Sequence, residues 1–225
     1  MVYPARCPFC DEPVAGTREL ICRDCLSKLE FVKQPYCMKC GKQLKGQEEY
    51  CSDCSANNHK FDSGRSLLVY KGAVKKSVYR FKYKGRKEYA RAYAALVESQ
   101  MQTFFEQVKP DALVPVPLHR TRRRMRGYNQ SELLARHIGR RMGVPVRTKL
   151  VVRSRNTVPQ KNLDLSGRQN NLKKAFKLYR NDVKLNTIII IDDIYTTGST
   201  VDALAAVLRR AGVKKIYFLT LSGGK

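Results

Sequence analysis

The chain has 225 residues and a formal net charge of +25, and 43% of its residues are hydrophobic. This hydrophobic content excludes a wholly disordered chain, and no apolar run approaches the roughly 20 residues that a membrane-spanning helix needs. The amino-terminal segment lacks the apolar core of a secretory signal, so we expect a cytoplasmic protein without a membrane span.

Charge and cysteine content divide the chain near residue 60. Residues 1–60 carry a net charge of +1 and contain all eight cysteines, whereas residues 61–225 carry +24 and contain none. We therefore expect two domains with these bounds. Within the second domain, residues 61–110 are expected to form a hood and helices, and residues 111–225 the ligand-binding core. A field as positive as that of the second domain favours a polyanion, an anionic surface or a phosphorylated ligand.

The first domain contains four C-x-x-C pairs that recur about every 15 residues. Each pair points two sulfurs at one centre, and two pairs complete a tetrahedral Zn(Cys)4 site. We therefore expect two structural zinc ions, and no zinc catalysis because no cysteine is left over to leave a site open. An iron–sulfur cluster or a redox array is the alternative. The expected zinc ligands are Cys7, Cys10, Cys22, Cys25, Cys37, Cys40, Cys51 and Cys54.

The order of the pairs favours two successive sites, because joining neighbouring pairs closes shorter loops. One site would then use residues 7–25 and the other residues 37–54, while an interleaved cross-brace stays open. His59 follows the last pair and is interpreted as a linker residue. Sixty residues are too few for a large core, so zinc is expected to supply most of the folding energy of this domain.

The hood region is expected to begin with a strand at 66–70, followed by helices at 73–83 and about 86–107. Residues 71–91 hold nine basic residues and one acid, interleaved with Tyr79, Phe81, Tyr83 and Tyr89. Aromatic rings between cations suit single-stranded nucleic acid, because bases stack on the rings and phosphates pair with the cations. The alternative is a solvated helix face with the tyrosines in the core.

Strands and helices alternate through the rest of the chain, and the inner strands are apolar on both faces. This pattern predicts a parallel sheet covered by helices. We expect strands at 113–116, 150–152, 187–191 and 215–221, and helices at about 130–142 and 201–211. In such sheets, ligands bind beyond the carboxyl ends of the strands. The segments expected to contact a ligand are therefore residues 115–119, 153–174 and 192–200.

The sharpest motif is IIIIDDIYTTGST at residues 188–200. It places two acids, four hydroxyl side chains and a glycine before a helix, whose N–H groups and dipole favour an anion. The hydroxyls can donate to phosphate oxygens, and the carboxylates can accept from vicinal ribose hydroxyls, directly or through Mg²⁺. Alternatively, the acids cap a turn and the hydroxyls cap the helix. The candidate residues are Asp192, Asp193, Thr196, Thr197, Gly198, Ser199 and Thr200.

Residues 119–126 hold five arginines in eight positions. Arginine forks bind phosphates bidentately, so we expect this segment to contact phosphate or nucleic acid, with a solvated surface as the alternative. The sequence does not divide the arginines between two ligands. The expected contacts, including those from the hood, are Arg120, Arg122, Arg123, Arg124, Arg126, Lys82, Lys84 and Arg86.

The motif at residues 188–200 closely resembles the diphosphate-sugar signature of type I phosphoribosyltransferases. The resemblance implies 5-phosphoribosyl 1-pyrophosphate (PRPP) as ligand, with its ribose hydroxyls at Asp192 and Asp193, its 5′-phosphate at residues 196–200, and Mg²⁺ at the pyrophosphate. It also implies a pyrophosphate loop at Val116, Pro117 and Leu118. The expected fold is therefore α/β, with a parallel-sheet type I phosphoribosyltransferase-like domain after a small cysteine-rich double zinc ribbon. Residues 111–225 would be the PRPP-binding core.

The order of motifs along the chain narrows the resemblance to the ComF family. Four C-x-x-C pairs come first, followed by VYKG, KYKG, PVPLH, R-x-R-G-Y-N-Q and R-x-R-N-T-x-x-Q. This resemblance implies a part in the uptake of single-stranded DNA during natural transformation, beside a helicase-like ATPase. The resemblance supports phosphoribosyl transfer less strongly than DNA uptake, because a fold and a cofactor site do not determine which reaction a protein catalyses. The alternatives are a metabolic phosphoribosyltransferase acting on a nucleobase or amine, and a non-catalytic PRPP sensor.

Overall fold

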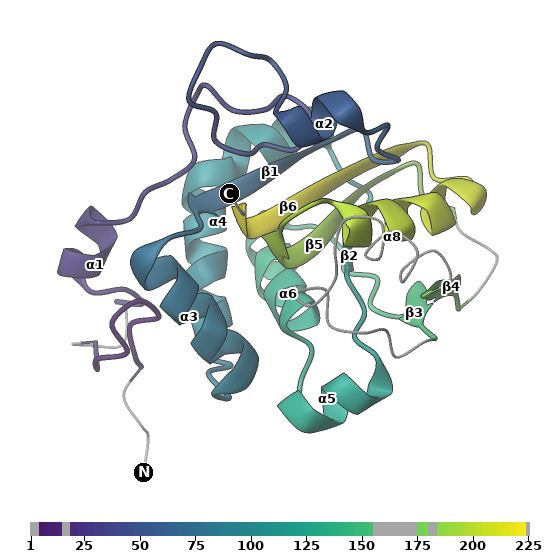
Figure 1. Cartoon of the computed structure of the whole chain (residues 1–225). Coiled ribbons are helices and arrows are strands. Elements are labelled where there is room, and N and C mark those ends of the chain that lie inside the picture. Colours follow the sequence, from purple (N-terminus) through teal and green to yellow (C-terminus); the bar gives the residue numbers. More distant parts are fainter. Residues whose placement is uncertain (1–4, 15–18, 155–174, 180–183, 224–225) are drawn as a thin grey trace.

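A computed structural model describes residues 5–14, 19–154, 175–179 and 184–223 (Figure 1). A parallel sheet lies at the centre, with helices on both faces and the cysteine-rich amino-terminal segments at its periphery (Figure 1). The predicted α/β fold with a parallel sheet is therefore confirmed. No helix within the described ranges is long and apolar enough to cross a membrane.

The central sheet has the strand order β1-β6-β5-β2, and all of its neighbouring strands are parallel. Its members are β1 (Ser63–Val69), β2 (Ala112–Pro115), β5 (Thr187–Tyr195) and β6 (Lys215–Gly223). We expected the strand at residue 187 to end at Ile191, but β5 continues to Tyr195. Asp192 lies opposite Thr220 and Tyr195 opposite Gly223, because the pairing with β6 keeps its register. The two acids therefore lie within the last part of the strand.

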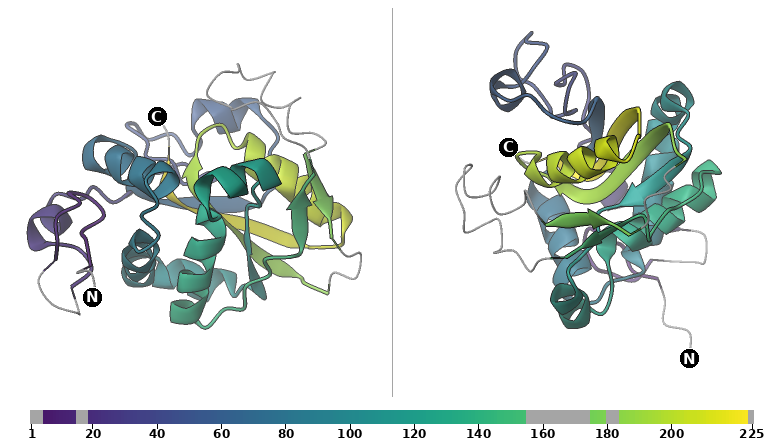
Figure 2. Two further views of the ribbon diagram at one scale, coloured as in Figure 1. Left: turned by 90° about the horizontal axis from the view of Figure 1, so that it is seen from below. Right: turned by 90° about the vertical axis from the view of Figure 1, so that its right-hand side faces the viewer.

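The four consecutive isoleucines of β5 explain how the sheet is buried on both faces. Ile189 and Ile191 share a hydrophobic core with α4 and α6, whereas Ile188 and Ile190 share another with α8. Figure 2 shows these helices on opposite sides of the sheet. The main helices are α3 (Gly72–Tyr83), α4 (Tyr89–Val108), α6 (Gln130–Met142) and α8 (Ser199–Arg210). Each lies within a few residues of its predicted position.

The sequence did not predict an arginine-rich helix and a short strand of the second domain, nor the two short helices of the amino-terminal segments. The arginine-rich segment forms the helix α5 (Arg120–Arg126), which begins where His119 Nδ1 accepts from Thr121 N at 3.3 Å and ends at Gly127 with φ +76°. Its sequence has no apolar periodicity, so no pattern indicated a helix. The strand expected at 150–152 is β3 (Val151–Arg153), which lies outside the parallel sheet and pairs antiparallel with β4 (Phe176–Leu178). No sequence pattern indicated β4. Most of the expected ligand segment 153–174 lies outside the described residues.

The amino-terminal segments, with the short helices α1 (Arg23–Ser27) and α2 (Ser52–Ala56), pack against two different parts of the second domain. Cys7, Phe9 and Val14 belong to the core of α3 and α4, whereas Cys37 and Cys40 belong to that of α8. Each segment thus shares a core with the rest of the protein. The domain boundary at residue 60 remains a proposal that rests on charge and cysteine content.

Candidate functional site

The eight cysteines form two clusters, and within each cluster the four Sγ atoms all lie within 4.8 Å of one another. The distances are 3.8 Å between Cys10 Sγ and Cys22 Sγ, and 3.7 Å between Cys40 Sγ and Cys51 Sγ. A tetrahedral zinc ion with bonds of about 2.3 Å separates its sulfurs by about 3.8 Å, so each cluster fits one zinc ion. The successive grouping is the one found: Cys7, Cys10, Cys22 and Cys25 in one cluster, and Cys37, Cys40, Cys51 and Cys54 in the other.

The surroundings of Cys40 in the second cluster favour the thiolate form of this cysteine. The Cys54 thiol donates a hydrogen bond to Cys40 and, against the effect of burial, lowers the pKa of Cys40 to about 6 with the help of the Lys42 amide. The thiolate is the form that binds zinc. The surroundings of Cys40 therefore favour the form of this thiol that binds zinc.

The acid pair of β5 contacts side chains from two helices that come earlier in the chain. Ser131 of α6 donates from Oγ to Asp192 Oδ1 at 2.8 Å. Lys82 of α3 places Nζ at 2.9 Å from Asp193 Oδ2. Lys82 was expected to contact nucleic acid or phosphate, and only 20% of its side chain is exposed because it is directed toward the acids. The strand and the two helices thus meet at the acid pair.

Burial and charge set the ionisation of this group. Burial raises the pKa of Asp192 to about 7 and the charge of Asp193 raises it as well, while Lys82 and Ser131 act in the opposite direction. Burial lowers the pKa of Lys82, but Asp193 and Asp192 outweigh it and bring that pKa above its usual value. Near neutral pH, Lys82 is therefore charged, and Asp192 is protonated in a fraction of the molecules.

The loop after β5 carries the expected phosphate ligands to the start of α8. Thr196 is exposed, and Thr197 Oγ1 lies 2.9 Å from Ser199 Oγ. Gly198, at the cap position of α8, has φ +76°, and a Cβ added there would lie 2.5 Å from Tyr195 Oη. Both the backbone angle and the surroundings therefore require glycine. With no side chain at the cap, the first N–H groups of α8, from Ser199 and Thr200 onward, can donate to an anion.

The expected pyrophosphate loop lies beyond β2 and is fixed by the motif GYNQ. Val116 is buried, and Pro117 and Leu118 are half-buried. Asn129 Nδ2 donates to Val116 O at 3.0 Å, while Asn129 Oδ1 accepts from Ser131 N at 3.2 Å and so caps α6. Next to it, the Tyr128 hydroxyl donates to Phe81 O of α3. The motif therefore joins α6, the loop after β2 and the end of α3 that carries Lys82.

The arginines that follow this loop differ in burial. Arg122 is half-buried, and burial together with the charge of Arg126 lowers its pKa. Burial lowers the pKa of Arg153, at the end of β3, to about 10; the charge of Arg122 contributes, and Asp192 opposes it. The charge of Asp192 thus acts on Arg153, while Arg122 interacts electrostatically with both Arg153 and Arg126. We had not named Arg153 as a site residue, although its segment was selected by the end of its strand. The remaining arginines Arg120, Arg123 and Arg124 are exposed.

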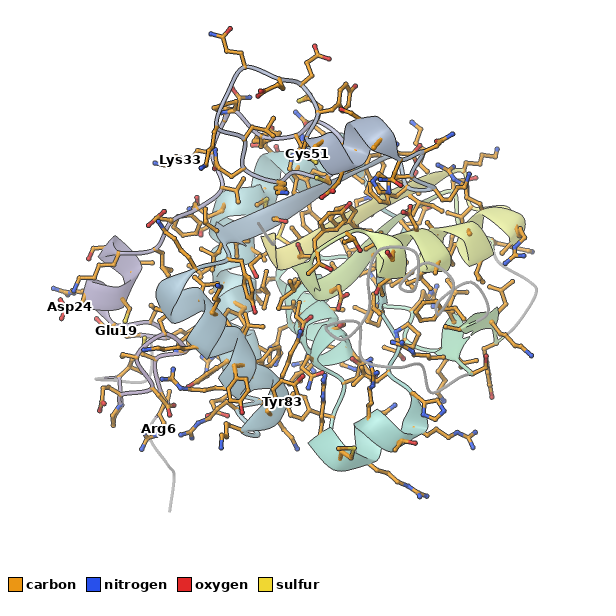
Figure 3. All side chains as sticks on the ribbon, in the orientation of Figure 1. Arg6, Glu19, Asp24, Lys33, Cys51 and Tyr83 are labelled. Carbon is orange, nitrogen blue, oxygen red and sulfur yellow. The ribbon has the colours of Figure 1, made fainter. Side chains whose placement is uncertain are left out.

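A second group of residues forms an exposed surface at the end of α3. Tyr79 and Tyr83 are 54% and 55% exposed, and their ring centroids are 5.1 Å apart. The Arg126 guanidinium of α5 lies 4.7 Å from the Tyr83 ring centroid and donates to its hydroxyl at 3.2 Å. Figure 3 shows Tyr83 at the lower end of α3, beside α5. We call Tyr79, Tyr83 and Arg126 the tyrosine–arginine surface. Phe81 and Tyr89, by contrast, are buried, so only part of the aromatic set lies in the core.

A basic groove of about 790 Å³ continues from this surface along α3 toward the first cysteine cluster. Arg86, which we expected to contact nucleic acid or phosphate, borders the groove and pairs with Asp11 at 2.8 Å. The groove is lined by Asp11, Tyr70, Lys75, Lys76, Tyr79, Arg80, Lys84 and Arg86. Its lining contains five cations and one acid, which is the charge balance that a polyanion requires.

Both parts of the chain match known protein families. Residues 1–55 match the double zinc ribbon domain, and residues 128–224 match the phosphoribosyl transferase domain. The first match and the two four-cysteine clusters together support two structural zinc ions. The second match agrees with the parallel sheet and with the loop after β5.

Curated relatives align with nearly the whole chain. Competence protein F of Haemophilus influenzae is 30% identical over 218 residues, which cover 94% of this chain and 93% of that protein. The DNA utilization protein YhgH of Escherichia coli K12 is 30% identical over 220 residues and 96% of each chain. Competence protein ComFC of Bacillus subtilis is 31% identical over 211 residues, or 86% of this chain and 80% of that protein.

Proposed function

The chain belongs to the ComF family of competence proteins, and from this premise we propose that it acts in the uptake of DNA. In this proposal it binds single-stranded DNA on the tyrosine–arginine surface and PRPP with Mg²⁺ at the acid pair. The names of the relatives, competence protein and DNA utilization protein, support the process. A helicase-like ATPase is the partner that the family resemblance implies.

The observation that carries the PRPP assignment is the acid pair beside the start of α8. Asp192 and Asp193 would accept hydrogen bonds from the ribose hydroxyls, and residues 196–200 would surround the 5′-phosphate. Lys82 of α3 pairs with Asp193, and the charge of Asp192 acts on Arg153 of β3, so cations from two elements lie near the acids. The pyrophosphate would lie beside residues 116–118, with Arg122 as a further contact. Mg²⁺, when bound, would neutralise part of the pyrophosphate charge.

The tyrosine–arginine surface supports binding of single strands. Exposed rings offer faces for bases to stack on, and stacking tolerates any base. Arg126 and the groove cations, among them Lys84, supply charge for the phosphates. Since such contacts lack hydrogen bonds to base edges, we propose binding without sequence preference.

The same acid pair and arginines also support a second candidate function, metabolic phosphoribosyl transfer. Positive groups beside the pyrophosphate would stabilise the charge that develops as it leaves. The acceptor would then be a nucleobase or an amine. Release of pyrophosphate from PRPP in the presence of candidate acceptors distinguishes this function from binding alone.

Calorimetry of PRPP with Mg²⁺, with and without single-stranded DNA, tests the main proposal. Charge-assisted hydrogen bonds contribute roughly 1.5–3 kcal/mol each, so Asp192→Ala with Asp193→Ala should weaken PRPP binding at least about tenfold. Glu98→Ala with Glu106→Ala is the matched control, because both acids lie on α4, where Glu98 pairs with Arg141. Unchanged affinity in the aspartate double variant would refute the assignment.

A further inference from the structure

The linker between the second zinc site and β1 lies along α8, the helix that begins at the phosphate loop. Near the start of α8, His59 Nδ1 lies 2.6 Å from Asp202 Oδ2, and Lys60 N donates to Asp202 Oδ1 at 2.8 Å. Near its end, Arg209 pairs with Asp62 at 2.6 Å. Asp202 N in turn donates to Gly198 O at 2.8 Å. The linker therefore contacts both ends of the helix, and at one end it reaches the loop.

The polar side chain of His59 is buried against an aromatic ring. Its side chain is 2% exposed, and its ring stacks on Phe61 with centroids 4.7 Å apart. Within the described part of the chain, His59 Nε2 has no hydrogen-bond partner, and such a buried group costs free energy. A phenylalanine would pack here without that cost. The hydrogen bond to Asp202 is therefore the interaction that accounts for an imidazole at this position.

His59 also contacts the phosphate loop directly. A Cβ added to Gly198 would lie 3.2 Å from His59 Cε1 and 2.5 Å from Tyr195 Oη. The backbone of Gly198 thus lies against both side chains, with φ +76°. Because Asp202 and Gly198 are both in contact with His59, the imidazole limits where the first turn of α8 can lie.

The position of His59 depends in turn on the second zinc site. Lys39, between Cys37 and Cys40, places Nζ 5.5 Å from the Phe61 ring centroid, and Gly64 N donates to Lys39 O at 2.9 Å. A Cβ added to Gly41 would lie 2.5 Å from Gly64 O, so this C-x-x-C turn lies directly on the start of β1. The contacts run without a gap from the zinc-binding turn through Phe61 to His59. The first cluster packs instead with α3 and α4.

We propose that His59 is a positioning residue for the phosphate loop. The second zinc site and Phe61 hold its ring, and the ring holds Asp202 and Gly198 in the geometry that accepts a phosphate. The zinc ribbon would thereby influence ligand affinity in the neighbouring domain without touching the ligand. This inference rests on the proposed binding of PRPP at residues 196–200.

Two substitutions at the same position test the proposal. His59→Phe keeps the ring and removes the donor to Asp202, so the affinity for PRPP with Mg²⁺ should fall at least about tenfold, the lower end of what supporting partners contribute at ligand sites. His59→Asn restores a donor near Nδ1 and should recover most of the affinity. Both proteins should retain two zinc ions and the wild-type affinity for single-stranded DNA. Arg209→Ala, which breaks the contact at the other end of α8, is the control and should change PRPP affinity less than about twofold.

Hydrogen exchange of the amides of residues 196–202 provides a readout that does not need PRPP. We expect faster exchange in His59→Phe and no change in Arg209→Ala. Faster exchange in a protein whose wild-type form fails to bind PRPP would refute the proposed ligand and support the positioning role. Unchanged exchange in folded His59→Phe with two zinc ions would overturn the inference. If His59→Phe does not fold, Asp202→Ala replaces it, and unchanged exchange there has the same meaning.

Discussion

Asp192 is a site carboxyl whose ionisation falls in the physiological range, because burial brings its pKa to about 7. In the folded protein its proton is held more tightly than in the unfolded chain. This contribution to stability is fully present below the ordinary carboxyl pKa near 3.8 and is lost as the pH rises through about 7. Above neutral pH Asp192 therefore stabilises the fold least and, being ionised, is best able to accept ribose hydroxyls.

We expect the affinity for PRPP to increase between about pH 6 and pH 8, because the ionised carboxylate accepts two hydrogen bonds and the acid form accepts fewer. Calorimetry across this range measures the effect. The ligand's own phosphate titrates near pH 6, so Asp192→Asn is the reference. An equal pH dependence in Asp192→Asn would assign the effect to the ligand alone.

Arg122 and Arg126 are four residues apart and should differ in their ligands. Arg122 is half-buried and acts electrostatically on Arg153, on which Asp192 also acts, whereas Arg126 lies over Tyr83. We expect Arg122→Ala to weaken PRPP binding at least about tenfold and to change DNA binding little.

Arg126→Ala should weaken DNA binding and change PRPP binding little. If five phosphates are neutralised, the logarithm of DNA affinity should fall with the logarithm of salt concentration at a slope of about −3.5, and loss of one contact should reduce that slope by about 0.7. Titrations at four salt concentrations measure the slopes. Equal effects of both variants on both ligands would contradict the division.

At the scale of elements, α3 contacts the two proposed ligand regions with different side chains. Lys82 reaches Asp193, while Tyr79 and Tyr83 are exposed next to Arg126. The helix is fixed by Val74, Val78 and Phe81, which are buried. A single helix therefore connects the acid pair with the tyrosine–arginine surface.

Tyr83→Ala should weaken binding of single-stranded DNA by roughly 1–3 kcal/mol if its ring stacks on a base. The melting temperature should stay nearly constant because the side chain is 55% exposed. The salt slope should also change little, since no charge is removed. Tyr50→Ala is the matched control, an exposed tyrosine of the second zinc ribbon. Lower stability with unchanged DNA affinity would show that the Tyr83 ring stabilises the fold and does not bind a base.

The elements that the sequence predicted well are those with a local signal. Helix α6 has apolar residues at helical spacing, and its bounds agree with the prediction; the isoleucine run likewise indicated β5. Helix α5 lacked such a signal, because its stability depends on the caps at His119 and Gly127. The contact of Lys82 with Asp193 joins residues far apart in sequence, so no local pattern indicates it. For the same reason, the roles of Arg122 and Arg126 could not be separated before the fold was known.

At the scale of the whole molecule, the two zinc sites stabilise different halves. The first shares a core with α3 and α4, and the second with α8. We expect metal analysis to give about two zinc ions per chain, without the visible absorbance of an iron–sulfur cluster. Removal by a strong chelator should lower the melting temperature, because the metal supplies folding energy. A folded protein with a zinc content near zero would contradict the structural role.

The strand β6 lies between β1 and β5 although it follows both of them in the sequence. During synthesis, β1 leaves the ribosome about 150 residues before its hydrogen-bonding partner exists. The zinc-binding turns can form early, but the sheet closes only after β6 has emerged, and such long-range pairing is slow. A stop codon just after Lys214 would therefore remove the middle of the sheet, not its edge. We expect such chains to expose apolar strands and to be degraded, so the cell would obtain either the whole fold or none of it.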